Sequence, residues 1–474
     1  MERNVPVWAV ALIVLCLLLF TMVFGWAVRS TIGGSDRSGL FGRVAVEIAE
    51  FPHLMRRTYQ EVVQGATGRP DEALSIWPPY APDQKGQRPL PGSLEAGLVG
   101  LSLRGDPGEY RPGWRLLTGT FALAEGEDGT APDAAPDAAI GDAFGHRALL
   151  LSPEMEIARV WDLDAGLVEE TAEPGRRAPH AMTILPDLSL ISGFDGGRTL
   201  RRIGPCGEAM WERAGGYHHA VSSDAGGTRL WTLRNRGDTN YRRHEFVELD
   251  AETGEDLRVF NVADIIAANP ETGALELRRS LDDAGAGWNY REAPDKWLFD
   301  PHHFNDIDPL PPELAEAFPG FEAGDLLISA RSIDLVFAVD PDTQELRWYS
   351  HGPWIRQHDP DWQPNGTITV YDNRMGRLHS RIVSIDPRSG AVGTRLAGED
   401  TDFHSRIRGK HDITPGGHVL VAATQQGRAF EVAANGDIVL DILNHSADRE
   451  RSFGIAHFEW LPPDAVEGDG TCPG

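Results

Sequence analysis

A histidine stands at the same point of a sequence pattern that occurs six times along the chain. Each histidine opens a short stretch that runs into a turn and then an apolar segment, as in HDPDWQPNGTITVYD from His358. The turn residues, among them Pro-Asn-Gly and Pro-Gly-Gly, suit tight reversals between two strands. The six are His180, His219, His303, His358, His411 and His457. Because imidazole can act as nucleophile or proton carrier, this repeat predicts a ring of histidines with a chemical role.

Polar neighbours distinguish three of these histidines from the others. Asn305 lies two residues after His303, so both side chains share one face of an extended strand. Arg331 ends the apolar strand of the same unit. These groups are cationic or neutral donors without an obvious carboxylate base, which predicts a cup for a sulfate, phosphate or carboxylate group. The predicted cup consists of His219, His303, Asn305, Arg331, Arg356 and His358.

The remaining histidines of the repeat have a simpler interpretation as well. A histidine that recurs with a turn can serve only to tie that turn by hydrogen bonding. For His180, His411 and His457 this structural role is the alternative to a place in the site.

The elements that must position these residues are short strands. Between the histidine hairpins runs a second recurrent hairpin, such as VFAVDPDTQELRWYS from Val336. Together the two hairpins make six four-stranded units of roughly 40 to 55 residues, the length of a propeller blade. The sequence therefore predicts an all-β fold, a six-bladed β-propeller whose first strands line a central channel.

The last blade has too few residues of its own at the C-terminus. His457–Leu461 has no room after it for three more strands, whereas Gly113–Gly119 and the hairpin from Leu149 can supply them. We therefore predict a ring closed by pairing an N-terminal with a C-terminal strand, which removes the unpaired edge. A seventh blade that uses Gly97–Arg104 is the competing interpretation.

The N-terminal region differs from the rest in composition. No charged residue occurs from Val5 to Val28, a length that spans a bilayer. We expect an uncleaved transmembrane anchor over residues 1–29, a helical segment (around Val44–Val63) and a Pro-rich linker (Trp77–Pro91) within 30–92, and the propeller over 93–474. The flanking arginines, taken alone, favour a cytoplasmic propeller. The acidic stretch Glu125–Asp142 is expected to be a loop.

Charge and cysteine content restrict the partners. The net charge of −27 argues against nucleic acid or an anionic membrane surface as a partner. Of three cysteines, Cys16 lies in the apolar segment, which leaves Cys206 and Cys472 for the folded part. These two can form a disulfide or remain two thiols, since sequence does not show proximity.

The order of the polar motifs resembles a known family. H-x-N at His303, an arginine at a strand end (Arg331), then Gln-His before Pro-Asn-Gly and a Tyr-Asp-Asn segment are similar to the bacterial arylsulfotransferases. The resemblance runs from about Gly113 to Leu461, with Asp359 after the histidine and YDNRMG in place of the more usual FDNG as departures.

The resemblance implies a six-bladed, usually periplasmic enzyme that moves a sulfuryl group between phenols without a nucleotide sulfate donor or any cofactor. It implies His358 as the nucleophile, and His219, His303, Asn305 and Arg331 as the residues that hold the sulfate. The expected partners are an aryl sulfate donor, a phenolic acceptor and the membrane through the N-terminal helix.

The chemistry suits these residue types. Neutral imidazole can attack the sulfur in line and so split one transfer into two displacements. Fixed donors must hold the charge on the spectator oxygens, and a second imidazole, from His219 or His303, must move the phenol proton.

Two other function classes remain open. Asn305, Asp359, Asp412 and Glu459 offer oxygen ligands for a calcium ion in a propeller hydrolase or lactonase. A propeller that only binds a partner at a membrane is the second. A quinone-dependent dehydrogenase fits less well, because the chain has no vicinal cysteine pair.

Overall fold

The computed structural model divides the chain into two units, which are described separately. It describes residues 7–32, 39–41, 44–46, 48–49, 76–77, 80, 82, 85–105, 113–124, 144–164, 178–195, 199–235, 241–276, 302–468, 470 and 472. One unit comprises residues 1–71 and 277–293, and the other comprises 72–276 and 294–474.

The first unit contains helix α1 (Val7–Ile32), where the sequence predicts the apolar segment. Its stretch Leu12–Ser30 has a mean hydropathy of 2.3 and is long enough to cross a membrane. A membrane anchor and a signal sequence both have these properties. Most of the helix expected around Val44–Val63, and all of the acidic stretch Glu125–Asp142, lie outside the described residues.

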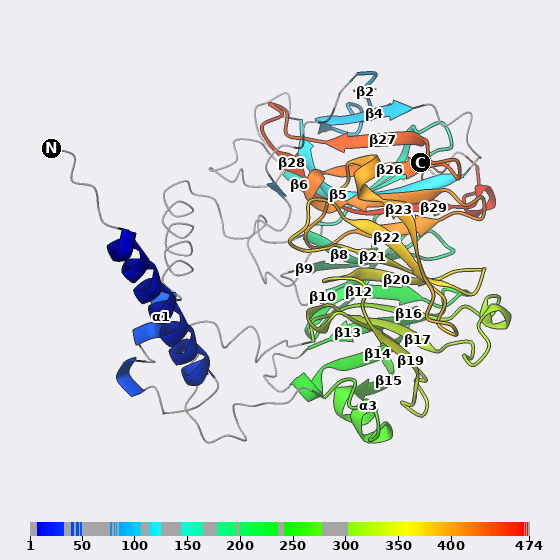
Figure 1. Ribbon diagram of the computed structural model, residues 1–474. Helices are drawn as coiled ribbons and strands as arrows, with labels where there is room; N and C mark the ends of the chain where they lie inside the picture. The colour runs from blue at the N-terminus through cyan, green and yellow to red at the C-terminus, as the bar shows by residue number, and fades with distance from the viewer. Residues whose placement is uncertain are drawn as a thin grey trace. The chain divides into compact units, whose positions relative to one another are not determined.

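The second unit is a ring of six antiparallel blades (Figure 1). The first complete blade in chain order contains β8 (Ala178–Ile184), β9 (Leu190–Asp195), β10 (Thr199–Ile203) and β11 (Ala209–Ala214). The second contains β12 (Tyr217–Ser223), β13 (Arg229–Arg234), β14 (Glu245–Asp250) and β15 (Asp256–Asn261), and helix α3 (Val262–Ala268) follows it. The third contains β16 (Phe304–Pro309), β17 (Leu326–Ala330), β18 (Leu335–Val339) and β19 (Leu346–His351).

The remaining blades continue in the same order. The fourth contains β20 (His358–Trp362), β21 (Ile368–Asp372), β22 (Arg381–Ile385) and β23 (Val392–Ala397), with the short helix α5 (Gly398–Thr401) after it. The fifth contains β24 (Lys410–Ile413), β25 (Val419–Ala423), β26 (Arg428–Val432) and β27 (Ile438–Asn444). The sixth joins β29 (Ile455–Leu461) to β5 (Trp114–Leu123), β6 (Phe144–Leu151) and β7 (Ile157–Asp162).

The predicted closure of the ring is confirmed. The C-terminal strand β29 pairs with the N-terminal strand β5, with His457 opposite Thr118 and Leu461 opposite Trp114. The first strands touch one another in the order β8, β12, β16, β20, β24 and β29, and β29 touches β8 again. These first strands therefore surround the central channel.

The segment that was considered for a seventh blade extends two existing blades instead. β3 (Leu98–Val99) pairs with β5, whereas β4 (Leu101–Gly105) pairs with β27 and β2 (Arg88–Pro89) with β4 (Figure 1). The chain passes between the two blades at Gly100, where a Cβ atom would lie 1.9 Å from the carbonyl oxygen of His445. Only glycine fits this crossing, which also has a positive φ of 75°.

The core lies between neighbouring blades. Every residue of the middle strands β17 and β18 is buried, because each of these strands packs against blades on both sides. In the outermost strand β19 no residue is buried. Apolar residues on both faces of the middle strands therefore hold the ring together, mainly through burial of apolar surface.

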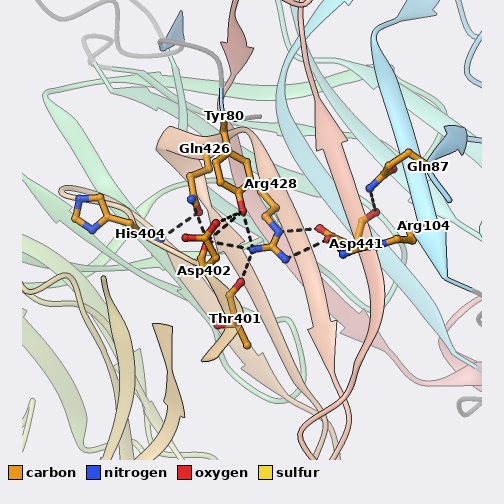
Figure 2. A network of polar contacts seen from close by, with 9 residues as sticks. All are labelled: Tyr80, Gln87, Arg104, Thr401, Asp402, His404, Gln426, Arg428 and Asp441. Carbon is orange, nitrogen blue, oxygen red and sulfur yellow. Dashed lines mark hydrogen bonds and ion pairs between the residues drawn. The ribbon is translucent and has the colours of Figure 1, made fainter. Parts of the chain in front are cut away.

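Part of the predicted linker is bound to the propeller. β1 (Ile76–Trp77) pairs with β28 (Ser452–Phe453), and the hydroxyl of Tyr80 donates to the carbonyl of Asp402 at 3.1 Å. Arg428, in turn, donates to the Tyr80 hydroxyl and forms an ion pair with Asp441 at 2.7 Å (Figure 2). The predicted Pro-rich linker thus contacts the propeller through Tyr80, whose hydroxyl has Arg428 as a buried polar partner.

A disulfide joins the two cysteines that the sequence left unassigned. Cys206 lies in the turn between β10 and β11, and Cys472 follows the closing strand β29. Their Cα atoms are 5.7 Å apart, a normal separation for a disulfide.

Candidate active site

A histidine cluster lies where the first strands of the blades begin. The ring centroids of His180 and His219 are 4.8 Å apart, and those of His219 and His303 are 4.6 Å apart, both edge to face. His358 and His457 line the same cavity as His180 and His219. We call His180, His219, His303, His358 and His457 the histidine tier. The cavity is small and has room for about one water molecule.

A β-bulge accompanies each histidine of this tier. The register shifts at or next to the histidine in β8, β12, β20 and β29, whereas in β16 it shifts at Asn305, two residues after His303. Residues His219 and His303 also have positive φ angles of 64° and 53°. A bulge turns a side chain away from the regular alternation of a strand.

His411 is the repeat histidine that does not join the tier. Its strand β24 pairs with β25 in continuous register. The imidazole of His411 instead contacts Asp359 at 2.8 Å and Asp361 at 3.2 Å. The predicted ring of six thus contains five histidines, because β24 lacks the bulge.

Both ring nitrogens of His358 form hydrogen bonds. Nδ1 lies 2.7 Å from Oδ1 of Asn373, and Nε2 accepts a hydrogen bond of 3.1 Å from the backbone N–H of Arg408. Burial, followed by the positive charge of Arg331, lowers the pKa of His358 well below its usual value. The imidazole is therefore neutral at neutral pH and has the lone pair that a nucleophile requires.

Two other predicted residues, Arg331 and Asn305, lie around His358. Arg331 follows β17, donates through its backbone N–H to the carbonyl of His303 at 3.1 Å, and helps to lower the pKa of both His219 and His358. Asn305 lines the cavity and donates to the carbonyl of Gln357 at 2.8 Å. Its Oδ1 has no hydrogen-bond partner within the described part of the chain.

His219 is one of the two histidines predicted to transfer a proton, and His303 is the other. Its Nδ1 lies 2.7 Å from Nδ1 of His218, and its ring packs between His180 and His303. Burial, and next the neighbouring His303, lowers its pKa well below the usual value. An additional proton on one of these rings is therefore unfavourable until an anion is present.

Arg356 is not brought to the cavity lining. Its guanidinium donates to the hydroxyl of Ser332 at 3.1 Å, and its backbone N–H donates to Asp334 at 2.7 Å. It has a positive φ of 59°, so the chain turns just before His358. The sequence placed Arg356 near His358 but did not show that a turn directs its side chain to Ser332.

Three residues of the site were not selected from the sequence. Arg408 lines the cavity and forms an ion pair with Asp195 at 2.5 Å. Lys410 also lines it, and Asn373 contacts His358. The signal was present for Asn373, which ends the Tyr-Asp-Asn motif, and for the basic run Arg408-Gly409-Lys410 directly before a repeat histidine.

A second group of titratable residues follows the histidines along the first strands. Lys410 Nζ forms ion pairs with Asp306 at 2.7 Å and Asp359 at 2.5 Å. Asp361 contacts His411, and Asp412 accepts from the backbone N–H of Trp460 at 2.8 Å. We call Asp306, Asp308, Asp359, Asp361, Asp412 and Glu459 the carboxylate tier.

Burial decides the protonation of most of the carboxylate tier. Burial and the neighbouring Asp306 raise the pKa of Asp308 to about 8, while burial and Asp412 raise the pKa of Glu459 to about 8. Burial alone would also raise the pKa of Asp359, but Lys410 and His411 outweigh it and lower this pKa. Asp308 and Glu459 are therefore largely protonated at neutral pH, whereas Asp359 beside Lys410 is ionised.

Two groups of residues have the geometry to share a metal ion. Ligand atoms lie within 4.8 Å of one another in His180, Asp195 and His219, and again in Asp359, Asp361 and His411. In each group one carboxylate already has a cationic partner, Arg408 for Asp195 and Lys410 for Asp359. A bound ion would have to compete with these side chains for its negative ligand.

The sequence matches a family model. The model described as arylsulfotransferase (ASST) matches residues 181–445, which is more than half of the chain and includes β9 to β27 in full. No curated protein matches the chain.

Solved structures that match the chain are distant in sequence. A protein of unknown function from Bacteroides caccae shares 11% identity with a TM-score of 0.45, over 74% of this chain and 99% of that one. TolB from Acinetobacter baumannii shares 10% identity with a TM-score of 0.41, over 74% and 67%. Virginiamycin B lyase from Staphylococcus aureus shares 10% identity with a TM-score of 0.33, over 55% and 69%.

Proposed function

Because the chain belongs to the arylsulfotransferase family, we propose that it transfers a sulfuryl group from an aryl sulfate to a phenol through a sulfurylated His358. The observation that supports this most directly is a buried imidazole with a lowered pKa that lines a cavity together with three other histidines, Arg408 and Lys410. Such a site attracts an anion and provides a neutral nitrogen nucleophile to attack it.

In the first half-reaction, Nε2 of His358 attacks the sulfur of the donor. An N–S bond forms, the bond between sulfur and the aryl oxygen breaks, and the phenolate leaves with the electron pair and takes up a proton. In the second half-reaction, the oxygen of the acceptor phenol attacks the same sulfur and the N–S bond breaks. His219 and His303, whose rings are in contact, are the candidates to give and remove the phenol proton.

The charge on the three spectator oxygens must be balanced by fixed donors. We assign this role to Arg331, Asn305 and the imidazoles around them, because the charge of Arg331 already acts on His358 and Asn305 lines the cavity. Donors that are fixed before the reaction stabilise the transition state without reorganisation.

We also propose that the propeller works outside the cytoplasm, in the periplasm, behind the N-terminal helix as an anchor. Helix α1 is long and apolar enough to cross a membrane, and the disulfide Cys206–Cys472 suits an oxidising compartment.

The test is transfer from a chromogenic aryl sulfate to phenol by the full chain in detergent, followed by mass analysis of the intact protein. We expect phenol-dependent release of the chromophore and the added mass of one SO₃ group. His358→Ala should lose both, while His351→Ala, at an exposed histidine, should keep both. Full activity of His358→Ala would reject the covalent route. Activity that depends on added calcium would instead support the hydrolase alternative.

A further inference from the structure

Asn373 contacts both the imidazole of His358 and the loop beside it. The residue directly follows β21 and is fully buried. Its amide nitrogen donates to two backbone carbonyls, those of Ser405 at 2.8 Å and Arg408 at 2.6 Å. Both amide hydrogens are thereby used, so the orientation of the amide is fixed and its oxygen points to His358.

This orientation determines where the proton of His358 is. The Oδ1 atom of Asn373 only accepts hydrogen bonds, so Nδ1 of His358 at 2.7 Å must be the donor. In a neutral imidazole the lone pair is then on Nε2. That lone pair accepts from the backbone N–H of Arg408 at 3.1 Å.

The backbone around Arg408 is held rigidly. Arg408 and Gly409 have positive φ angles of 63° and 116°. A Cβ atom at position 409 would lie 2.3 Å from the ring of Tyr371, so the turn packs tightly against that ring. Asn373 holds the carbonyl of Arg408, and the N–H of the same residue points at Nε2 of His358.

We propose that Asn373 is a positioning residue for sulfuryl transfer, which keeps His358 in the Nδ1–H tautomer and places the Arg408 N–H beside the sulfuryl group on Nε2. This inference rests on the proposed function. When sulfur bonds to Nε2, the lone pair is used, and the Arg408 N–H donates to a neighbouring sulfuryl oxygen instead. The backbone of Arg408 would thus join Arg331 as an oxyanion donor.

The neutral amide also matters for the second half-reaction. Attack by Nε2 with the proton retained on Nδ1 gives an imidazolium that carries the sulfuryl group. Its positive charge makes neutral imidazole the leaving group when the acceptor phenol attacks. An aspartate at position 373 would attract this proton and leave a neutral sulfurylated ring, from which the phenol displaces the imidazole more slowly.

The first experiment reads the tautomer without any substrate. The full chain is labelled with ¹⁵N-histidine, and the His358 signals are assigned by their loss in His358→Ala. We expect wild type to carry the proton on Nδ1, and Asn373→Leu to show a mixture of tautomers. A pure Nδ1–H tautomer in Asn373→Leu, or an Nε2–H tautomer in wild type, would overturn the proposal.

The second experiment separates the two half-reactions by rapid mixing. Asn373→Ala should slow sulfurylation by roughly 10²- to 10³-fold, as for the loss of one oxyanion donor. Asn373→Asp should accumulate sulfurylated enzyme, because its second half-reaction is slowed more than its first. Equal slowing of both steps in Asn373→Asp would contradict the role of the neutral amide.

Asn444 provides a matched control in the next blade. Its amide nitrogen also donates to two backbone carbonyls, those of Thr120 at 2.7 Å and Phe453 at 3.1 Å, but within the described part of the chain its Oδ1 has no hydrogen-bond partner. Asn444→Ala should destabilise the fold as Asn373→Ala does and leave both half-reactions unchanged. If the two variants lose stability and rate alike, Asn373 is only structural. If wild type forms no sulfurylated histidine, the proposed function fails, while the tautomer result still decides the role of Asn373.

Discussion

The histidine tier and the carboxylate tier line the same channel and share the strands β20 and β29, yet burial affects them in opposite ways. It lowers the pKa of the histidines, as at His457 with a pKa of about 4, and raises the pKa of the carboxyls, as at Asp308 with a pKa of about 8. In both tiers the low-polarity surroundings favour the neutral form. The neutral form of histidine has a reactive lone pair, whereas that of a carboxyl is a hydrogen-bond donor. The same physical effect therefore prepares one tier for chemistry and makes the other tolerable inside the ring.

The largest expected effect comes from the cation of the carboxylate tier. Lys410→Met leaves Asp306 and Asp359 without their ion-pair partner in a largely buried place. We expect a loss of about 3–5 kcal/mol in the free energy of unfolding, measured with urea. Adding Asp359→Asn to Lys410→Met should restore part of it. A loss below about 1 kcal/mol would mean that solvent already screens these charges.

The corresponding charge beside the histidine tier should affect rate more than stability. Arg331→Ala should reduce the transfer rate by roughly 10²- to 10³-fold, equivalent to about 2.7–4 kcal/mol, if Arg331 acts as a single oxyanion donor. Steady-state rates with a chromogenic aryl sulfate measure this effect. Arg356→Ala is the matched control, since the guanidinium of Arg356 contacts Ser332. A larger loss from Arg356→Ala than from Arg331→Ala would reverse the assignment.

The two tiers should change the free energy of unfolding with pH in opposite directions. The folded pKa of His457, about 4, lies below its unfolded value near 6.5, so stability is lost as pH falls from about 6.5 to about 4. The folded pKa of Glu459, about 8, lies above its unfolded value of about 4.5, so its contribution is lost progressively as pH rises from about 4.5 to about 8. Urea unfolding from pH 4 to 9 should show that Glu459→Gln removes a decline in stability between about pH 4.5 and 8, so stability rises more steeply with pH in the acid range and falls less toward pH 8. A smaller rise of stability in the acid range for Glu459→Gln than for wild type would contradict this sign.

The smallest effect on catalysis is expected at His411, which belongs to neither tier. Its imidazole contacts Asp359 and Asp361 because β24 lacks the bulge of the other first strands. His411→Gln should cost about 1–3 kcal/mol in stability, as for buried hydrogen bonds, and leave the transfer rate unchanged. Thermal unfolding and steady-state rates of the same preparation test this. A rate loss as large as that of His358→Ala would place His411 in the reaction.

Most of the fold and part of the candidate site could be predicted from the sequence repeat. The short segment after His457 predicted the β29–β5 closure, because six blades need a shared one. The direction of His411 was not predictable, since one missing bulge decides it and bulges leave no clear sequence signal. Arg408 was not predicted as a site residue, because its position depends on a turn with positive φ that sequence alone does not reveal. The pairing of Cys206 with Cys472 required a distance that only the folded ring provides.

The disulfide has a kinetic consequence for the closed ring. Cys472 follows β29, and its partner Cys206 lies in the blade next to the one that β29 completes. If β29 separates from β5, the disulfide therefore keeps the C-terminal segment close to its place in the ring. Re-pairing is then an intramolecular event at high effective concentration, far faster than the search of a free chain end. A reducing agent should leave the closed ring as it is but lengthen each opening, and so expose the strand edge of β5 to proteases and to other molecules.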